Sequence, residues 1–312
     1  MNGLINVLKP PGVSSHDVIV ELRHLFKIKK IGHTGTLDPG ATGVLPICVG
    51  QGTRVAEYLI NRPKKYRAEI TFGIRTDTFD AGGEVIKRNK GVRLELTDII
   101  DVLEDFKGEI KQVPPMVSAV HYQGKRLYQL ARQGKVVERK ARRVKIYQIE
   151  IIQFDGDLPY PRLYIDLECS KGTYVRSICE QVGERLGCGA YLSFLVRTKS
   201  GPFSLEESYT LEEIRDMWQK KDLSFLLPID YALSHLPALT VKEKAVPYIL
   251  NGLPLAPSGI LGGVGRELPN FVRLYSPERK LLALANLCTN SDGEWHYKLK
   301  KVFSSQYINS ER

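Results

Sequence analysis

The sequence predicts an α+β fold in which a mixed, mainly antiparallel sheet forms a large domain and a small β-rich domain follows it. Alternating apolar and polar runs such as Tyr66–Phe72 recur along the chain, and segments with helical spacing such as Thr97–Phe106 interrupt them. A proline-punctuated stretch begins near Pro228, and the 312 residues exceed what one hydrophobic core usually serves. We therefore expect a large domain over residues 1–235 and a small one over residues 239–308.

The first strand and the first helix have clear start and stop signals. Leu4–Leu8 is an apolar run, and the prolines and the glycine of Lys9–Gly12 end it because they cannot continue regular pairing. Ser14 and Asp17 have the spacing of a capping box, and apolar residues recur at helical spacing as far as Phe26. This pattern predicts a strand followed directly by an amphipathic helix.

A glycine-rich loop, Gly32–Gly43, comes next and leads into an apolar strand at Val44–Val49. Gly35 and Gly40 have the spacing of a phosphate-binding loop, but the lysine that such a loop needs is missing, which argues against an NTPase. Asp38 begins an Asp-Pro-Gly sequence, which is common in turns. Taken alone, this pattern leaves Asp38 either a turn residue or a functional carboxylate, because loops between regular elements often carry sites.

The rest of the chain alternates strands and helices. The expected elements are a helix Thr97–Phe106 capped by Thr97, a strand Val117–Val120, a short basic helix Arg126–Arg132, a long strand Val144–Phe154, a strand Leu163–Cys169, a helix Thr173–Leu186, a strand Tyr191–Arg197, a helix Val241–Leu250, and a hairpin of Phe271–Tyr275 with Leu281–Asn286.

Positive charge is concentrated in one segment. The chain carries a net charge of +10, and residues 121–150 contain nine basic and two acidic side chains. A basic insertion of this kind indicates a polyanionic partner, with Arg142 and Arg143 as expected phosphate contacts, although any single basic run can also be a solvated face. Four cations within Arg62–Arg67 surround Tyr66, as in sites that stack unpaired bases.

Cysteine and histidine spacing predicts no metal site. The five cysteines include no C-x-x-C pair, and the six histidines form no H-x-x-x-H or Cys/His cluster. No apolar run approaches the roughly 18 residues of a membrane span, and the first residues do not resemble a secretory signal. These features predict a cytoplasmic protein without membrane contact.

Several motifs, in order along the chain, resemble the TruB family of tRNA pseudouridine-55 synthases. The longest match joins Lys9-Pro10-Pro11-Gly12 to the loop and strand at Gly32–Leu45. Further matches are Lys65-Tyr66-Arg67, Arg75-Thr76-Asp77-Thr78 with Asp80, Pro114–Ala119, Lys171–Arg176 and Leu195–Thr198. The segment after Leu239 resembles, less specifically, the small PUA-type RNA-binding domain of the same family.

This resemblance implies a pseudouridine synthase domain whose basic insertion grips the T arm of tRNA. It implies Asp38 as catalytic carboxylate, Tyr66 as the ring stacked on the flipped target base, and Arg176 as the partner of the aspartate. The other residues implied to bind substrate or shape the pocket are Lys9, His33, Tyr174 and Leu195. Considered without the family, Tyr66, Tyr174 and Leu195 could be core residues, His33 could be a turn residue, and Arg176 could pair with Glu180 one turn along.

The implied chemistry needs neither cofactor nor metal. Isomerising uridine breaks the bond from N1 to C1′, turns the uracil and rejoins it through C5, so no atom is gained or lost. A carboxylate can act by covalent addition or by assisting deprotonation of the sugar, and the sequence leaves both routes open. A guanidinium close to Asp38 would lower the pKa of that carboxyl.

Two alternative functions share some of these features. One is the guide-RNA-dependent relative of the family, against which the basic insertion argues because it suits unguided recognition. The other is a non-catalytic RNA-binding or RNA-folding protein, which loss of Asp38 or Tyr66 would have favoured. We expect a stand-alone, monomeric enzyme that binds the T arm of tRNA without a guide RNA, and that also assists tRNA folding.

Overall fold

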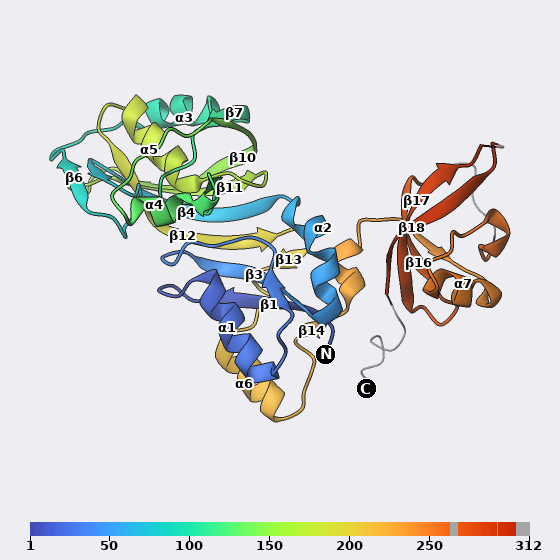
Figure 1. Cartoon of the computed structure of the whole chain (residues 1–312). Helices are drawn as coiled ribbons and strands as arrows, with labels where there is room; N and C mark the ends of the chain where they lie inside the picture. Colours follow the sequence, from blue (N-terminus) through green and yellow to red (C-terminus); the bar gives the residue numbers. More distant parts are fainter. Residues whose placement is uncertain (263–267, 292, 304–312) are drawn as a thin grey trace.

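The computed structural model describes residues 1–262, 268–291 and 293–303, and it has the predicted α+β fold class (Figure 1). The helices are α1 (Ser15–Phe26), α2 (Ala56–Ile60), α3 (Leu96–Glu104), α4 (Leu127–Ala131), α5 (Val175–Arg185), α6 (Leu211–Gln219) and α7 (Val246–Leu250), with short 3-10 helices at Gly50–Val55, Ile229–Leu233, Glu243–Ala245 and Pro257–Gly259.

The strands form one large sheet, one small sheet and two hairpins. The large sheet contains β1 (Gly3–Lys9), β2 (Ile31–His33), β3 (Thr42–Val49), β4 (Lys64–Phe72), β7 (Gly108–Gln112), β10 (Arg142–Asp155), β11 (Arg162–Cys169), β12 (Ala190–Ser200), β13 (Phe203–Ser204) and β14 (Leu226–Leu227). The hairpins are β5 (Ile74–Thr76) with β6 (Val85–Arg88), and β8 (His121–Tyr122) with β9 (Lys125–Arg126); the small sheet contains β15 (Ala238–Thr240), β16 (Phe271–Tyr275), β17 (Leu281–Thr289) and β18 (Trp295–Val302).

The large sheet has the strand order β14-β1-β3-β12-β4-β11-β10-β7. Neighbouring strands in this order run antiparallel except for β3 and β12, which run parallel with Thr42 opposite Val196 and Gly43 opposite Arg197. Helices α1 and α6 pack on the β1–β3 part of the sheet, and α3 and α5 cover the β4–β11–β10 part (Figure 1). The parallel pair therefore joins two separately packed halves.

Glycine is needed where the two halves meet. Gly43 has φ +109°, and a Cβ at this position would lie 2.3 Å from the carbonyl oxygen of Arg197. Any larger residue would push β3 away from β12. The loop that precedes β3 consequently ends at a fixed point on the sheet.

The small sheet shares a hydrophobic core with the large domain. Leu281, Leu284 and Phe303 pack in one cluster with Leu4 and Val55 from the N-terminal part of the chain. Arg54 donates a hydrogen bond to the carbonyl oxygen of Val302 across the same contact. The small sheet lies in the part of the chain where a β-rich tail over residues 239–308 is predicted; residues 304–308 lie outside the described part of the chain.

The prediction for the N-terminal part of the insertion region was wrong. Val117–Ala119 forms bends, and Val120 has no regular structure, so no strand is present there. The carbonyl oxygens of Ser118 and Val120 accept hydrogen bonds from the first turn of α4 at Tyr128 and Leu127, so they are not available to a strand partner. The insertion is therefore a hairpin and a helix held against a bent segment, not a strand-helix-strand unit.

Some helix boundaries also differ from those predicted. Thr97 is not the N-cap of α3, because Glu95 takes the extended cap conformation and its carbonyl oxygen accepts the amide hydrogen of Ile99. The helix predicted at Val241–Leu250 is α-helical only from Val246, after a short 3-10 turn. The predicted helix at Thr173–Leu186 begins at Val175, with Tyr174 as N-cap.

Candidate active site

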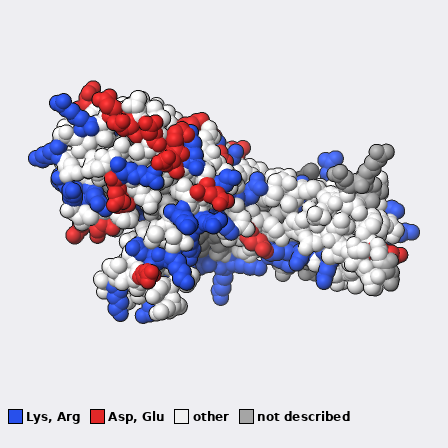
Figure 2. Space-filling view, turned by 90° about the horizontal axis from the view of Figure 1, so that it is seen from above, with Lys and Arg blue, Asp and Glu red and all other residues white. Residues whose placement is uncertain are grey.

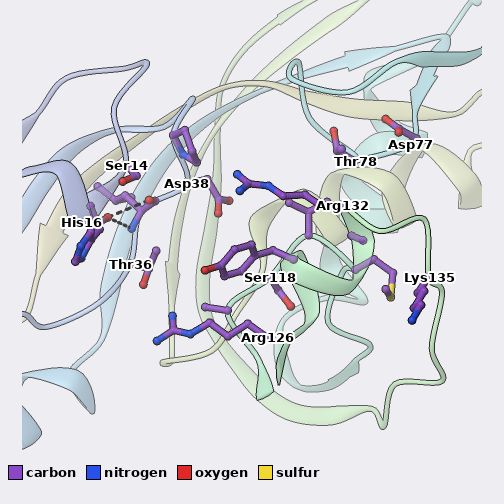
Figure 3. Close-up of a pocket in the computed structure, with 18 of the residues that line it drawn as sticks. Ser14, His16, Thr36, Asp38, Asp77, Thr78, Ser118, Arg126, Arg132 and Lys135 are labelled. Carbon is purple, nitrogen blue, oxygen red and sulfur yellow. Dashed lines mark hydrogen bonds between the residues drawn. The ribbon is translucent and has the colours of Figure 1, made fainter. Parts of the chain in front are cut away.

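A cleft of about 1000 Å³ lies between the N-terminus of α1, the glycine-rich loop and the basic insertion. Figure 3 shows Arg126 and Arg132 extending from the insertion into the space in front of Thr36 and Asp38. The lining residues come from segments far apart in the sequence: Ser14–His16, His33, Thr36–Pro39, Asp77, Thr78, Met116–Ala119, Arg126, Tyr128, Ala131, Arg132 and Gly134–Val136.

The carboxylate of Asp38 reaches this cleft from a tight turn. The amide of Ala41 donates to the carbonyl oxygen of Asp38 at 3.1 Å, so the Asp-Pro-Gly sequence does form the turn that its composition suggests. The side chain of Asp38 is 42% exposed and lines the cleft. Asp38 is therefore a turn residue whose carboxylate is also available to a substrate.

Arg176 is the ion-pair partner of Asp38. Its guanidinium lies 2.9 Å from the Asp38 carboxylate and 3.0 Å from that of Asp80, and its side chain is only 3% exposed. It also donates to the carbonyl oxygens of Thr78 and Val117. The alternative pairing with Glu180 was wrong, because Glu180 binds Arg75 at 2.7 Å.

Opposing effects of burial and nearby charges set the pKa of Asp38. Burial raises the pKa of Asp38 above its ordinary value; Arg176 lowers it and the nearby Asp80 carboxylate raises it. The lowering by Arg176 agrees with the prediction for a guanidinium close to Asp38, but burial is the largest effect and the pKa is raised overall. A raised pKa suits a group that must accept a proton or form and break a bond near neutral pH.

The main chain on both sides of Asp38 is held by hydrogen bonds from outside the loop. Ser15 Oγ accepts the amide hydrogen of Leu37 at 2.8 Å and donates to its carbonyl oxygen at 3.0 Å. The carbonyl oxygen of Pro39 accepts from the amide of Gly12 at 2.8 Å and from Lys9 Nζ at 3.2 Å. The segment around α1 thus fixes the middle of the loop.

Lys9 lies beneath the loop rather than in the cleft. Its side chain is 0% exposed, and the ammonium also donates to the carbonyl oxygens of Pro10 and Val13. Burial lowers the pKa of Lys9 to about 8. In this conformation Lys9 supports the loop and cannot touch RNA, so the expected contact with RNA requires correction.

His33 stands at the start of the loop and lines the cleft. Its Nδ1 accepts the amide hydrogen of Gly35 at 3.3 Å, which leaves Nε2 as the protonated nitrogen. Burial and, next, the charge of Arg197 lower the pKa of His33 to about 4. The imidazole is therefore neutral at pH 7 and offers one N–H donor.

Tyr66 and Leu195 lie on neighbouring strands beside the loop. Tyr66 on β4 is paired with Arg197 on β12, and Leu195 is paired with Ala68 two positions further along. Tyr66 is half-buried against the core that contains Leu195. The structure brings both residues to the same side of the sheet as Asp38's loop, although neither lines the cleft.

The cations near Tyr66 do not surround its ring. Successive strand residues point to opposite faces, so Lys65 and Arg67 lie on the face away from Tyr66. There they pair with Glu168 at 3.1 Å and with Asp166 at 2.7 Å. The prediction that cations surround the ring of Tyr66 was therefore wrong for Lys65 and Arg67.

Tyr174 and Arg142 come close to the site, whereas Arg143 does not. Burial raises the pKa of the Tyr174 hydroxyl, and the charges of Arg142 and Asp38 lie close enough to affect it. Arg143 is next along β10 and therefore points to the opposite face, where it lies 3.9 Å from Glu109. The two neighbouring arginines cannot contact the same surface of a ligand.

Several residues of the site were not assigned a role from the sequence. They are Asp80, Arg126, Tyr128, Arg132 and Arg197. Asp80 and Arg197 belong to motifs that were recognised, but only the tertiary contacts give them partners. Arg126 and Arg132 were counted in the basic segment, and their exposure to the cleft depends on how α4 packs.

Figure 2, seen from the side of α3 and α5, shows a run of acidic side chains on this part of the large domain. The charge of the molecule is therefore not uniform over its surface.

Within the described residues, no group of three or more His, Cys, Asp or Glu side chains could hold a metal ion. No helix in the same part of the chain is long and apolar enough to cross a membrane.

Comparison with known proteins shows which family the chain resembles. A family model described as "TruB family pseudouridylate synthase (N terminal domain)" matches residues 23–175, and one described as "tRNA pseudouridylate synthase B C-terminal domain" matches residues 176–234. Both matches fall within the predicted large domain.

Whole-chain relatives agree with these matches. A tRNA pseudouridine synthase B of Pelotomaculum thermopropionicum is 49% identical over 292 residues, covering 91% of each chain. Its counterpart in Moorella thermoacetica is 47% identical over 305 residues, covering 96% of this chain and 98% of the relative.

Among solved structures, a chain of a Cbf5-Nop10-Gar1 complex is similar, with a TM-score of 0.73 and 28% identity, covering 99% of this chain and 87% of that chain. A chain of an H/ACA RNP bound to a substrate RNA has a TM-score of 0.72 and 27% identity, with 98% and 86% covered. The fold is that of a pseudouridine synthase. Within this class, the chain belongs to the TruB family.

Proposed function

We propose that this protein converts the T-loop uridine at position 55 of tRNA to pseudouridine, as a stand-alone enzyme. The observation that carries the proposal is the placement of Asp38: its carboxylate reaches a large cleft, on a loop fixed by hydrogen bonds, 2.9 Å from a buried arginine. The 47–49% identity to tRNA pseudouridine synthase B proteins supports the same substrate.

The residues of the site suit the isomerisation. Uridine must leave its stack to reach Asp38, at a cost of a few kcal/mol, and the ring of Tyr66 can recover part of this cost by stacking on the flipped base. Asp38 acts on the sugar or the base, either by adding covalently or by accepting a proton. Arg176 holds the carboxylate in place and stabilises its charged form when the proton leaves.

The binding of tRNA would use the basic wall of the cleft. Arg126, Arg132 and Lys135 line it from the insertion, and Arg142 approaches from β10 near Tyr174. Charges on this wall would hold the phosphates of the T arm while the target base enters. The neutral imidazole of His33 would donate one hydrogen bond to the bound RNA, and Leu195 would support the pocket from the core.

The tail after residue 239 would act as an additional RNA-binding module of the PUA type. The monomeric state, location in the cytoplasm, independence of guide RNA and a contribution to tRNA folding belong to the same proposal. Similarity to chains from Cbf5 and H/ACA complexes favours one second candidate, a guide-dependent enzyme. The basic insertion and the higher identity to tRNA pseudouridine synthase B argue for the unguided enzyme.

A T-arm stem-loop with tritium at C5 of its uridines tests the proposal. The purified protein alone should release tritium at one position, and the product should contain pseudouridine only at the nucleotide equivalent to 55. A stem-loop with that uridine replaced by cytidine is the matched control. No release from the parent stem-loop, with activity restored by a guide RNA, would favour the second candidate.

A further inference from the structure

Arg197 is a buried cation without an acidic partner among the described residues. Its side chain is 1% exposed and is the largest of the fully buried side chains. No carboxylate oxygen of a described residue lies within ion-pair distance of it. Burying an unpaired guanidinium is costly, so main-chain groups must satisfy it, and the identity of those groups indicates what the arginine does.

The guanidinium binds the loop of Asp38 at both ends. Nη2 donates to the carbonyl oxygen of Gly35 at 3.1 Å and Nη1 contacts that of Thr36 at 3.4 Å, before Asp38 in the sequence. Nε donates to the carbonyl oxygen of Val44 at 2.7 Å, after it. One planar side chain therefore closes the base of the loop.

The main chain of the same residue joins the loop to the sheet. Arg197 is opposite Gly43 in the parallel pair of β12 with β3, and opposite Tyr66 in the antiparallel pair of β12 with β4. Its guanidinium also lies near the Tyr66 hydroxyl: burial raises the pKa of that hydroxyl, and the charge of Arg197 lowers it. The loop of Asp38 and the ring of Tyr66 thus share one anchor.

The two groups share two further supports, because Leu37 and Ala41 of the loop pack in the same core as Tyr66 and Arg176 of α5 holds the Asp38 carboxylate. Lys9 and Ser15 hold the middle of the loop from the side of α1, through hydrogen bonds to Pro39 and Leu37. Tyr66 packs in the core under α3 and α5. Arg197 adds hydrogen bonds from β12, the strand paired with Tyr66, to the main chain of the loop, and these bonds resist a shift between the two halves of the sheet.

We propose that Arg197 is a positioning residue for the reaction: it holds the Asp38 loop at a set distance from the Tyr66 ring, without touching the substrate. This inference rests on the proposed function, because the set distance matters only for a base that stacks on Tyr66 while Asp38 acts on the same nucleotide. A displacement of about 1 Å between catalytic groups can cost roughly 10²-fold in rate.

The substitution Arg197→Lys tests the proposal, since it keeps the charge but loses the planar fork that reaches three carbonyls. We expect tRNA affinity, from filter binding, within about 3-fold of the parent. The single-turnover rate of tritium release at saturating enzyme should fall by roughly 10- to 100-fold. Hydrogen exchange of the amides at residues 34–38 should become faster.

Arg273→Lys is the matched control. Arg273 is partly buried rather than fully buried, but it likewise donates to a main-chain carbonyl oxygen, that of Leu236, and it lies in the small domain, outside the cleft. This variant should keep the parental saturating rate even if its melting temperature falls as much as that of Arg197→Lys. A parental saturating rate in Arg197→Lys would overturn the inference, as would an equal loss of rate in both variants.

Arg197→Met provides a second measurement that does not depend on the lysine. It removes the cation that lowers the pKa of His33, so the His33 titration followed by NMR should move up from about 4. Together with a rate loss at least as large as that of Arg197→Lys, this shift supports positioning. If the methionine variant does not fold, the lysine variant still tests the positioning role of Arg197.

The activity of the parent protein on tRNA is measured separately, and inactivity of the parent would contradict the proposed function rather than the role of Arg197.

Discussion

The loop of Asp38 and the basic insertion face each other across the cleft, yet they are built in opposite ways. In the loop, main-chain groups from Gly35 to Val44 bind Ser15, Lys9 and Arg197, all of which are buried. The insertion contains two-residue strands and a five-residue helix, and only Leu127 and Leu130 of α4 are buried. The loop side of the cleft is held by buried hydrogen-bonding groups, whereas the insertion side has few buried residues.

This contrast follows from the different demands of catalysis and of binding. A bond-making carboxylate must be held to within a fraction of an ångström, which requires satisfied polar groups and close packing. Phosphate recognition depends on charge and reach, so long cations on a loosely anchored segment are adequate. Regions with little buried apolar surface also open at low free-energy cost, which helps a folded RNA to enter.

The sharpest test of the comparison is Asp38→Asn. The amide keeps the shape of the side chain but cannot act as a nucleophile or a base, so we expect the single-turnover rate to fall by roughly 10³-fold or more. The affinity for tRNA should stay within a few-fold, because the phosphate contacts are unchanged. Tritium release and filter binding on one preparation give both quantities, and parallel loss of the two would indicate a misfolded loop instead.

Neutralising the basic wall should have the reverse effect. The double substitution Arg126→Gln and Arg132→Gln should weaken tRNA binding by about 10-fold or more and leave the saturating rate near that of the parent. The slope of log affinity against log salt should become shallower by roughly 0.7–0.9 for each phosphate that the variant no longer neutralises. An unchanged slope would mean that these arginines do not bind phosphate.

The acid limb of the pH–rate profile tests the environment of Asp38 on the loop side of the cleft. Burial raises the pKa of Asp38, and the reaction needs its ionised form. The single-turnover rate should therefore fall, as pH is lowered, at a higher pH than an ordinary aspartate with a pKa of about 3.9 would give. Asp80→Asn removes the second carboxylate, which also raises this pKa, so the acid limb should move to lower pH.

The two arginines of β10 provide a smaller, paired test. Arg142→Gln should weaken tRNA binding about 3-fold or more, because this side chain lies near Tyr174 and the cleft. Arg143→Gln should change affinity less than about 2-fold, because its side chain points to the opposite face, beside Glu109. Equal effects, measured at the same salt concentration, would show that RNA also contacts the far face of β10.

The smallest expected effect concerns stability in acid. His33 has a pKa near 4 in the folded protein and an ordinary value of 6.5. The unfolded chain therefore binds a proton first as pH falls, so the stabilising contribution of neutral His33 is complete above about pH 6.5 and is lost as pH falls toward 4. In His33→Gln, the free energy of unfolding from urea titrations should depend less on pH over this window; an identical dependence would contradict the lowered pKa.

Local sequence patterns account for a large part of this protein. The capping box at Ser14 and Asp17, the strand at Tyr66–Phe72 and the turn at Asp38 all formed as predicted, because each depends on residues close together in the chain. The helix α6 was missed although Thr210 and Glu213 form a capping box, so its signal was present. The motifs also identified Asp38 and Arg176, which the structure places 2.9 Å apart.

The environment of these residues, by contrast, comes from the tertiary structure alone. The sequence does not reveal that Arg176 is shared with Asp80, that Lys9 is wholly buried, or that Arg142 and Arg143 face opposite ways relative to the cleft. The net direction of the Asp38 pKa shift depends on desolvation, which is a property of the assembled cleft. Hydrogen-bond partners and burial are set by segments more than 100 residues apart, as between Arg197 and Gly35, and no local pattern contains that information.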